Sequence, residues 1–145
     1  MTPVAVVDTN VIATGLMTAH DDAPTARILD GMLAAAFPFA ISESLLAEYR
    51  DVLNRPALRK RHGLKQAEIE SLLIALARNA IVLTPVAGPA APDPSDQHLW
   101  DLLASHAGLC LVTGDKLLLQ QSSAPARMLA PAEFVERGLD AQMTD

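Results

Sequence analysis

Aromatic residues are scarce in this chain of 145 residues: they make up 3% of the sequence, with a single Trp and a single Tyr. The core must therefore be built mainly from aliphatic side chains, and half of all residues are hydrophobic. Only 19% of the residues are charged, so the composition argues against long disordered segments. The length predicts one domain, which we expect to cover residues 1–139, with a flexible tail at 140–145.

Cysteine and long apolar runs are also nearly absent. The single cysteine, Cys110, excludes an internal disulfide, and its setting in "GLCLVT" predicts a core residue in a reducing compartment. No apolar run approaches the roughly 18 residues that a membrane span needs. No basic segment precedes the first apolar stretch, so a signal peptide is not predicted. We therefore expect a cytoplasmic protein.

Positive charge is in short supply as well. The chain has 11 Lys and Arg residues against 17 Asp and Glu residues, a formal net charge of −6. Proteins that bind nucleic acids through general electrostatics usually carry an excess of Lys and Arg, so this count opposes a nuclease function. The objection weakens if several acids surround a divalent cation, because the occupied site is then far less negative.

Short apolar strands alternate with amphipathic helical segments along the chain. This alternation indicates a parallel sheet covered on both faces, so we expect an α/β protein: a single-domain, three-layer α/β/α fold with a central parallel sheet. The expected strands are 4–7, 39–41, 81–83, 109–113 and 127–129. The expected helices are 24–36, 42–56 with Ser42 as N-cap, 65–80, 96–108 with Gly108 as C-cap, and 131–138.

Acidic residues lie at the ends of two expected strands. Asp8 follows the strand at 4–7, and Asp115 follows the strand at 109–113 in "LCLVTGDK". Because ligands of open α/β sheets bind beyond the carboxyl ends of the strands, both carboxylates are expected at one edge of the sheet. Glu48 flanks the apolar stripe of the 42–56 helix and could point along that edge, and Asp96 begins the 96–108 helix.

Each of these acids also has an ordinary structural explanation. Asp8 and Asp115 could cap helical turns, Glu48 could be solvated and paired locally, and Asp93 with Asp96 could simply start a helix. Four acids at one edge nevertheless repel one another unless a cation lies between them. Oxygen ligands, with no second cysteine and no metal-ligand spacing among the four histidines, favour Mg²⁺ or Mn²⁺ over Zn²⁺.

Four segments of the chain together resemble the PIN-domain family, and most closely its toxin-like branch, which is found in bacterial toxin–antitoxin pairs. They are "VVDTNVIATGL", "SESLLAEYRDVL", "DPSDQHLWDLLASHAGLCLVTGDKLLL" and "MLAPAEFVE". The resemblance covers nearly the whole chain in the right order. "DTN" alone is a weak signal, but with "LVTGDK" and "APAEF" it becomes fairly specific.

The resemblance implies a ribonuclease that uses Mg²⁺ or Mn²⁺ and a cluster of acidic residues. Matched by motif, the catalytic and metal-binding residues are Asp8 in "DTN", Glu48 in "LLAEY", Asp96 in "DPSDQHL" and Asp115 in "TGDK". Relatives often read "DPDD" where this chain reads "DPSD", so the third acid is either Asp93 or Asp96, and we favour Asp96.

The same resemblance extends to the surroundings and partners of this cluster. Thr9, Asn10 and Thr113 match polar positions beside the acids. An RNA substrate, a cognate antitoxin protein and a homodimer are implied. The alternative is a catalytically inactive PIN-like scaffold that binds RNA or a protein. A phosphatase with an aspartyl nucleophile is excluded because Asn10 stands where its "DxDxT" motif has the second acid.

Basic residues that could hold the phosphates of RNA follow the helix that carries Glu48, in "RPALRKRHG". A solvated basic helix end is the other explanation, because a helix dipole favours cations there. Lys116, beside Asp115, is a further candidate. The candidates in the basic segment are Arg55, Arg59, Lys60 and Arg61, with His62 next to them.

Overall fold

The structure is a computed structural model that describes residues 3–121 and 124–140. Within these residues five short strands pair, and each of the pairings is parallel. One group has the order β1-β4-β5 and the other is the pair β2-β3. The strands are β1 (Val4–Val7), β2 (Ala40–Ile41), β3 (Ile81–Val82), β4 (Leu109–Val112) and β5 (Arg127–Leu129).

The order of the strands reverses beside β1. A parallel bridge between Ala5 and Phe39 brings β2 alongside β1, so the full order is β3-β2-β1-β4-β5. Val7 is paired with Val112 at the last position of the register, and β1 and β4 therefore end level with each other. Ligands of such sheets bind where the strand order reverses, beyond the carboxyl ends. In this chain that point lies between β1 and β4.

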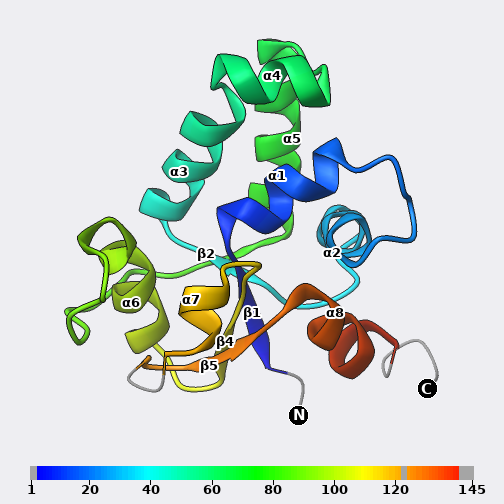
Figure 1. Ribbon diagram of the computed structural model, residues 1–145. Helices are drawn as coiled ribbons and strands as arrows, with labels where there is room; N and C mark the ends of the chain where they lie inside the picture. The colour runs from blue at the N-terminus through cyan, green and yellow to red at the C-terminus, as the bar shows by residue number, and fades with distance from the viewer. Residues whose placement is uncertain (1–2, 122–123, 141–145) are drawn as a thin grey trace.

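Helices connect the strands and cover both faces of the sheet. Crossovers between parallel strands are right-handed, so the reversal places α1 to α5 on one face and α6 and α7 on the other. Figure 1 shows α1, α2, α3 and α5 packed together above the strands, with α6 and α7 apart from that group. The helices are α1 (Thr9–Met17), α2 (Pro24–Leu33), α3 (Glu43–Leu53), α4 (Pro56–His62), α5 (Gln66–Asn79), α6 (Gln97–Ala104), α7 (Lys116–Leu119) and α8 (Pro131–Phe134).

The expected α/β fold with a central parallel sheet is confirmed, and all five expected strands are present, most of them shortened. α1, α4 and α7 lie beyond the helices that the sequence predicted, and two further details differ. The helix expected at 131–138 continues past α8 as a π-helical segment, Val135–Asp140. α6 ends at Ala104 with Ser105 as its C-cap, so the predicted C-cap at Gly108 is wrong. Gly108 has a φ of 85° in the turn before β4, a conformation that favours glycine. Residues 141–145 of the expected tail lie outside the described residues.

The core is largely aliphatic, as the composition predicts, but its largest buried side chains include Trp100 and Tyr49. The Tyr49 hydroxyl donates a hydrogen bond to the Val7 carbonyl, which ties α3 to the end of β1. Cys110 is buried in β4, and burial raises the pKa of its thiol to about 11. None of the helices in residues 3–121 and 124–140 is long and apolar enough to cross a membrane.

Candidate active site

Asp8 lies at the carboxyl end of β1, at the point where the strand order reverses. Its backbone N–H donates to the Val112 carbonyl at 2.9 Å, which extends the pairing of β1 and β4 past the last residue of β1. Its side chain caps α1, because Oδ1 accepts a hydrogen bond from the Thr9 N–H at 2.8 Å. The residue is only 8% exposed. The predicted capping role is therefore real, and it leaves Oδ2 for other partners.

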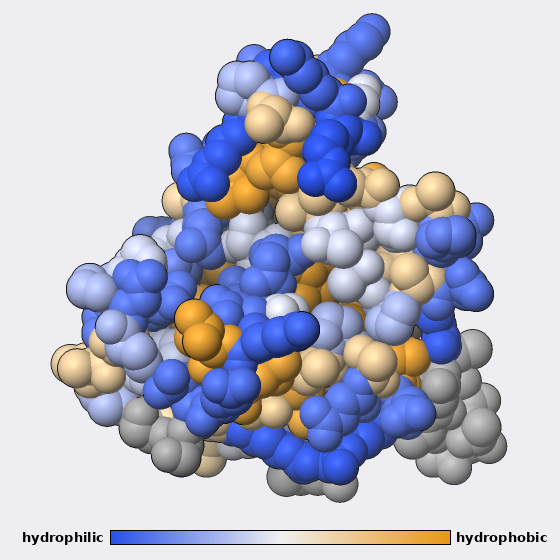
Figure 2. Space-filling view, viewed as in Figure 1, coloured by the Kyte–Doolittle hydropathy of each residue, from blue (hydrophilic) through white to orange (hydrophobic). Residues whose placement is uncertain are grey.

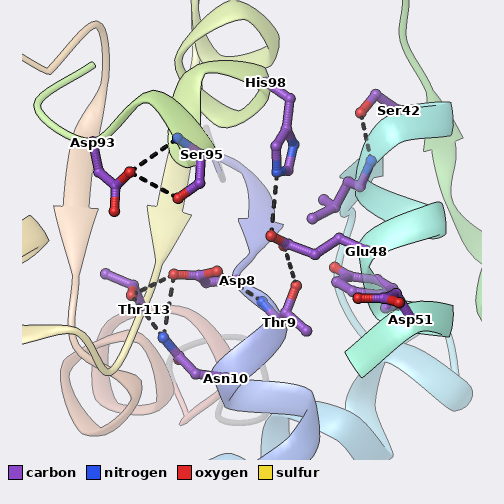
Figure 3. A network of polar contacts seen from close by, with 12 residues as sticks. Asp8, Thr9, Asn10, Ser42, Glu48, Asp51, Asp93, Ser95, His98 and Thr113 are labelled. Carbon is purple, nitrogen blue, oxygen red and sulfur yellow. Dashed lines mark hydrogen bonds and ion pairs between the residues drawn. The ribbon is translucent and has the colours of Figure 1, made fainter. Parts of the chain in front are cut away.

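Thr113 and Asn10 hold the second oxygen of Asp8. The Thr113 hydroxyl donates to Asp8 Oδ2 at 2.8 Å and accepts a hydrogen bond from the Asp115 N–H at 3.0 Å. The Asn10 amide donates to Asp8 Oδ2 at 3.3 Å, and its own oxygen accepts from the Gly114 N–H at 3.0 Å. Figure 3 shows Asp8 between these side chains and Thr9. The network fixes the Asp8 carboxylate and joins the loop after β4 to α1.

Glu48 reaches from α3 toward the same place. One of its oxygens accepts a hydrogen bond from the Thr9 hydroxyl, and the other lies 3.4 Å from His98 Nε2 on α6. Figure 3 shows the carboxylate between these two side chains. The hydrogen bond from His98 is the main reason that the pKa of Glu48 is lowered, against its partial burial. Glu48 is therefore held by Thr9 at the start of α1 and by His98 on α6.

Asp93 and Asp96 have different surroundings, although both lie at the start of α6. Asp93 is exposed, and its Oδ1 accepts hydrogen bonds from the N–H and the hydroxyl of Ser95, both at 2.9 Å. The bond from the Ser95 N–H lowers the pKa of Asp93. Asp96 is half-buried, and its carboxylate accepts no hydrogen bond from any described residue. Burial and the charges of neighbouring carboxylates raise the pKa of Asp96.

Asp115 follows β4 and caps α7, since its Oδ1 accepts a hydrogen bond from the Leu117 N–H at 2.9 Å. Its second carboxylate oxygen has no hydrogen bond within the described part of the chain. Asp93, Asp96 and Asp115 line one hollow of about 280 Å³ between α7 and the loop before α6. The three acidic residues thus border a common space that is open to a ligand.

The four predicted acids share one electrostatic environment. Burial is the main cause of the raised pKa of Asp8, and the charges of Glu48 and Asp115 raise it further. The pKa of Asp96 is raised by burial first and then by the charges of Asp8, Asp93, Glu48 and Asp115. The sequence-based expectation that these carboxylates lie at one sheet edge and repel one another therefore agrees with their observed surroundings.

The chemistry of this group fits a hard divalent cation. The candidate donors are all carboxylate oxygens, the ligands that Mg²⁺ and Mn²⁺ prefer. The half-buried Asp96 carboxylate, which has acidic neighbours and no hydrogen-bond donor in the described chain, is a group that a cation would stabilise. As the side chains stand, no three His, Cys, Asp or Glu residues in the described ranges are arranged to hold a metal ion. A bound ion would therefore need side-chain movement.

His98 is a site residue that the sequence did not reveal. Its Nε2 lies beside Glu48, while its Nδ1 is buried and has no hydrogen-bond partner among the described residues. A single histidine, with no second histidine at the spacing of a metal site, does not predict metal binding from the sequence. The role of His98 arises where α6 packs against α3, a contact that one sequence does not show.

The predicted phosphate-binding residues fall into two places. Lys116 begins α7 directly beside Asp115, and its side chain is exposed. The others lie in or next to α4, which Figure 1 shows at the upper end of the molecule, away from the sheet edge. His62 does not belong with these cations. Its ring nitrogens contact the backbone of Leu53 at 2.9 Å and of Leu64 at 3.0 Å, so its role is structural.

Comparison with known proteins identifies the family of this chain. The PIN domain family model matches residues 4–117, a segment that contains Asp8, Glu48, Asp96 and Asp115. No curated protein matches the chain. A solved structure described as the PIN domain of RRP44 from T. brucei is 14% identical, with a TM-score of 0.49 over 99% of this chain and 85% of that chain. The extent of the family match shows that the chain belongs to the PIN-domain family.

Proposed function

We propose that this protein is a metal-dependent ribonuclease that hydrolyses RNA phosphodiester bonds at the edge of the sheet. PIN domains are generally nucleases, and in this chain the charges of Glu48 and Asp115 raise the pKa of both Asp8 and Asp96. The observation that carries the proposal is the Asp96 carboxylate, half-buried among other acids with no hydrogen-bond donor in the described chain. Such a group is costly in a purely structural role, because buried charges are normally paired or bound to metals.

Asp8, Asp96 and Asp115 are the residues that would hold Mg²⁺ or Mn²⁺, with Glu48 holding a second ion or a bound water. When bound, the ion supplies Lewis-acid polarisation of the scissile phosphate and activation of the attacking water. Hydrolysis at such a site would leave a 5′-phosphate and a 3′-hydroxyl, as the family resemblance implies.

The protein's own contribution is to position these carboxylates. Thr113 and Asn10 fix Asp8 through its Oδ2, and the Thr9 hydroxyl and His98 orient Glu48. Partners of this kind set the direction and basicity of metal-binding groups. We assign Lys116, which is exposed next to Asp115, to contact with a substrate phosphate near the reacting bond.

The direct test is cleavage of a mixed pool of structured and single-stranded RNA, with Mg²⁺, with Mn²⁺ and with a chelator. We expect metal-dependent cleavage by the wild type and a loss of at least about 100-fold in Asp8→Asn, because outer-sphere partners alone are worth about 10–100-fold. Circular dichroism establishes that the variant is folded. Asp30→Asn, the same change at an exposed carboxylate of α2, is the matched control and should cleave like the wild type.

A toxin role in a toxin–antitoxin pair is a finer part of the proposal, and it is supported by the sequence resemblance. It entails a cognate antitoxin protein and a homodimer. Induced expression in a bacterial host should arrest growth with wild-type protein and not with Asp8→Asn. Unimpaired growth with an enzyme that is active in vitro would contradict the toxin role and leave the ribonuclease proposal standing.

A PIN-like scaffold that binds RNA or protein without cutting is the competing function. It is favoured by the lack, within the described residues, of three acidic or histidine side chains already arranged for a metal ion. The two functions differ in the RNA-cleavage experiment. Binding of RNA without cleavage under every metal condition would favour the scaffold.

A further inference from the structure

The segment 55–65 is an exception in an acidic protein. The chain carries a net charge of −6, yet this segment has five of its 11 Lys and Arg residues and no Asp or Glu. Arg55 is paired with Asp51, at 3.2 Å on the adjoining helix α3. We call the other four residues the cationic cap, and they are Arg59, Lys60, Arg61 and Lys65.

The side chains of the cationic cap have no ion-pair partner in the described part of the chain, although the Glu68 carboxylate lies beside the cap and accepts a hydrogen bond from the Lys65 N–H at 3.0 Å. All four side chains are exposed, and none forms an ion pair with a described acid. The last turn of α4 favours cations because of the helix dipole, but a dipole end provides only a fraction of one negative charge for Arg59, Lys60 and Arg61. Lys65 lies outside this turn, at the N-cap of α5. Figure 2 shows hydrophilic residues projecting from this upper end of the molecule.

Three of the four cations, Arg59, Lys60 and Lys65, line a hollow on a fixed piece of backbone. The hollow measures about 410 Å³ and is lined by Pro56, Arg59, Lys60, Gly63, Leu64 and Lys65. The C-cap of α4 is Gly63, whose φ of 72° favours glycine. Its N–H donates a hydrogen bond to the Arg59 carbonyl at 2.9 Å. His62 ties this turn to the end of α3 through Leu53. The cations therefore project from a constrained turn.

The cationic cap lies apart from the carboxylates but on a path to them. From Glu48 to Leu53, α3 rises by about 8 Å, at about 1.5 Å per residue, and α4 follows beyond that point (Figure 1). Arg55 lies between the two regions, close enough for its charge to lower the pKa of Glu48. A polyanion that leaves the candidate active site along α3 would pass Arg55 and then reach the cap.

We propose that the cationic cap is a binding site for backbone phosphates of single-stranded RNA, separate from the carboxylates, which anchors only strands long enough to reach it. This inference deepens the proposed ribonuclease function and rests on it for the identity of the ligand. Exposed Lys and Arg side chains that have no ion-pair partner in the protein can neutralise RNA phosphates. This binding releases the counterions that had been condensed on the RNA. The cap thus provides RNA affinity in a chain whose net charge opposes it.

The test compares two matched double variants, Arg59→Gln/Arg61→Gln in the cap and Arg78→Gln/Arg127→Gln at exposed positions elsewhere. Fluorescence anisotropy in chelator measures binding of two labelled RNAs at several salt concentrations. One is a dinucleotide, and the other has about 20 nucleotides, which spans both regions because a stacked strand advances about 3.4 Å per nucleotide.

For the long RNA, the cap variant should bind on the order of 10-fold more weakly at low salt, and its salt slope should fall by about 1.4, at about 0.7 per phosphate contact. The control variant should bind like the wild type. Binding of the dinucleotide should be equal in all three proteins. Equal losses in both double variants, no loss in the cap variant, or a matching loss with the dinucleotide would each overturn the proposal.

Failure of this inference and failure of the proposed function give different results. If the wild type cleaves RNA while the cap variant binds the long strand normally, the ribonuclease proposal stands and the cap proposal falls. If no metal condition gives cleavage while long RNA still binds through the cap, the anchoring site stands and the ribonuclease proposal falls.

Discussion

The candidate active site and the cationic cap are built in opposite ways. The Asp8 carboxylate is buried at the sheet edge, with both oxygens held by hydrogen bonds from Thr9, Thr113 and Asn10. Arg59 and Lys60 in the cap are exposed and have no ion pair with any described acid. The first region has groups fixed by hydrogen bonds and surrounded by other acids, and the second has cations that are exposed to solvent.

This difference corresponds to the two tasks of the proposed ribonuclease, which are chemistry and backbone binding. Chemistry requires groups at fixed positions, so a substitution there removes a function that no neighbour can replace. Backbone binding requires only enough positive charge, so each cation contributes a similar small amount. We therefore expect single changes at the sheet edge to have large effects and single changes in the cap to have small ones.

The largest expected difference in cleavage between two matched substitutions is that between Asp96 and Asp93, at the sheet edge. Asp96→Asn should reduce RNA cleavage by at least about 100-fold, because it removes a proposed metal ligand and not an outer-sphere partner. Asp93→Asn is the matched control, since Asp93 is exposed and bonded to Ser95, and it should cleave within a few-fold of the wild type. Single-turnover cleavage measures both. The reverse ranking would identify Asp93 as the third acid.

A smaller effect is expected where Glu48 is positioned. Thr9→Val removes a hydroxyl that donates to Glu48, and His98→Ala removes the histidine beside its other oxygen. Each substitution should lower the cleavage rate by about 10-fold, which is the lower end of the range for outer-sphere partners. Each variant should also need a higher Mn²⁺ concentration to reach its half-maximal rate. Thr14→Val, the same change at an exposed position of α1, should have no effect. An unchanged Mn²⁺ requirement in both variants would show that Glu48 does not need this support.

The smallest effect concerns stability without metal. Burial raises the pKa of Asp8 above its ordinary value of 3.8, so the folded chain binds a proton more readily than the unfolded chain, and ionisation of Asp8 destabilises the fold. Asp8→Asn in chelator at neutral pH should therefore unfold a few degrees higher than the wild type.

The pH dependence of this difference is the internal control. It should shrink as the pH falls through the raised pKa of Asp8 and disappear below 3.8, where the wild-type side chain is neutral in both the folded and the unfolded state. Thermal unfolding followed by circular dichroism measures it. A lower melting temperature for Asp8→Asn at neutral pH would mean that the hydrogen bonds to Asp8 outweigh its burial.

Local patterns in the sequence were sufficient for the strands and for the acids at their ends. Apolar runs followed by Asp8 and Asp115 predicted the edge at which both lie, because parallel strands end together. The capping explanations were also right for both residues. A carboxylate has two oxygens, so a helix cap and an electrostatic cluster are compatible, and the two interpretations never competed.

What the sequence did not predict depends on packing between distant segments. His98 reaches Glu48 only because α6 lies against α3. His62 was grouped with the cations by its place in "RPALRKRHG", but its ring holds the turn after α4. Neither contact produces a periodic pattern in the chain, and a histidine looks the same in a sequence whether it is structural or part of a site.

The measurement that tests the central claim most directly is Mn²⁺ binding by titration calorimetry to the wild type, Asp8→Asn, Asp96→Asn and Asp93→Asn. If the sheet-edge carboxylates bind the metal together, the wild type and Asp93→Asn should bind alike. Asp8→Asn and Asp96→Asn should bind at least about 10-fold more weakly, in keeping with the cost of losing a metal-site group. Equal binding by all four proteins, or no binding by the wild type, would contradict the account.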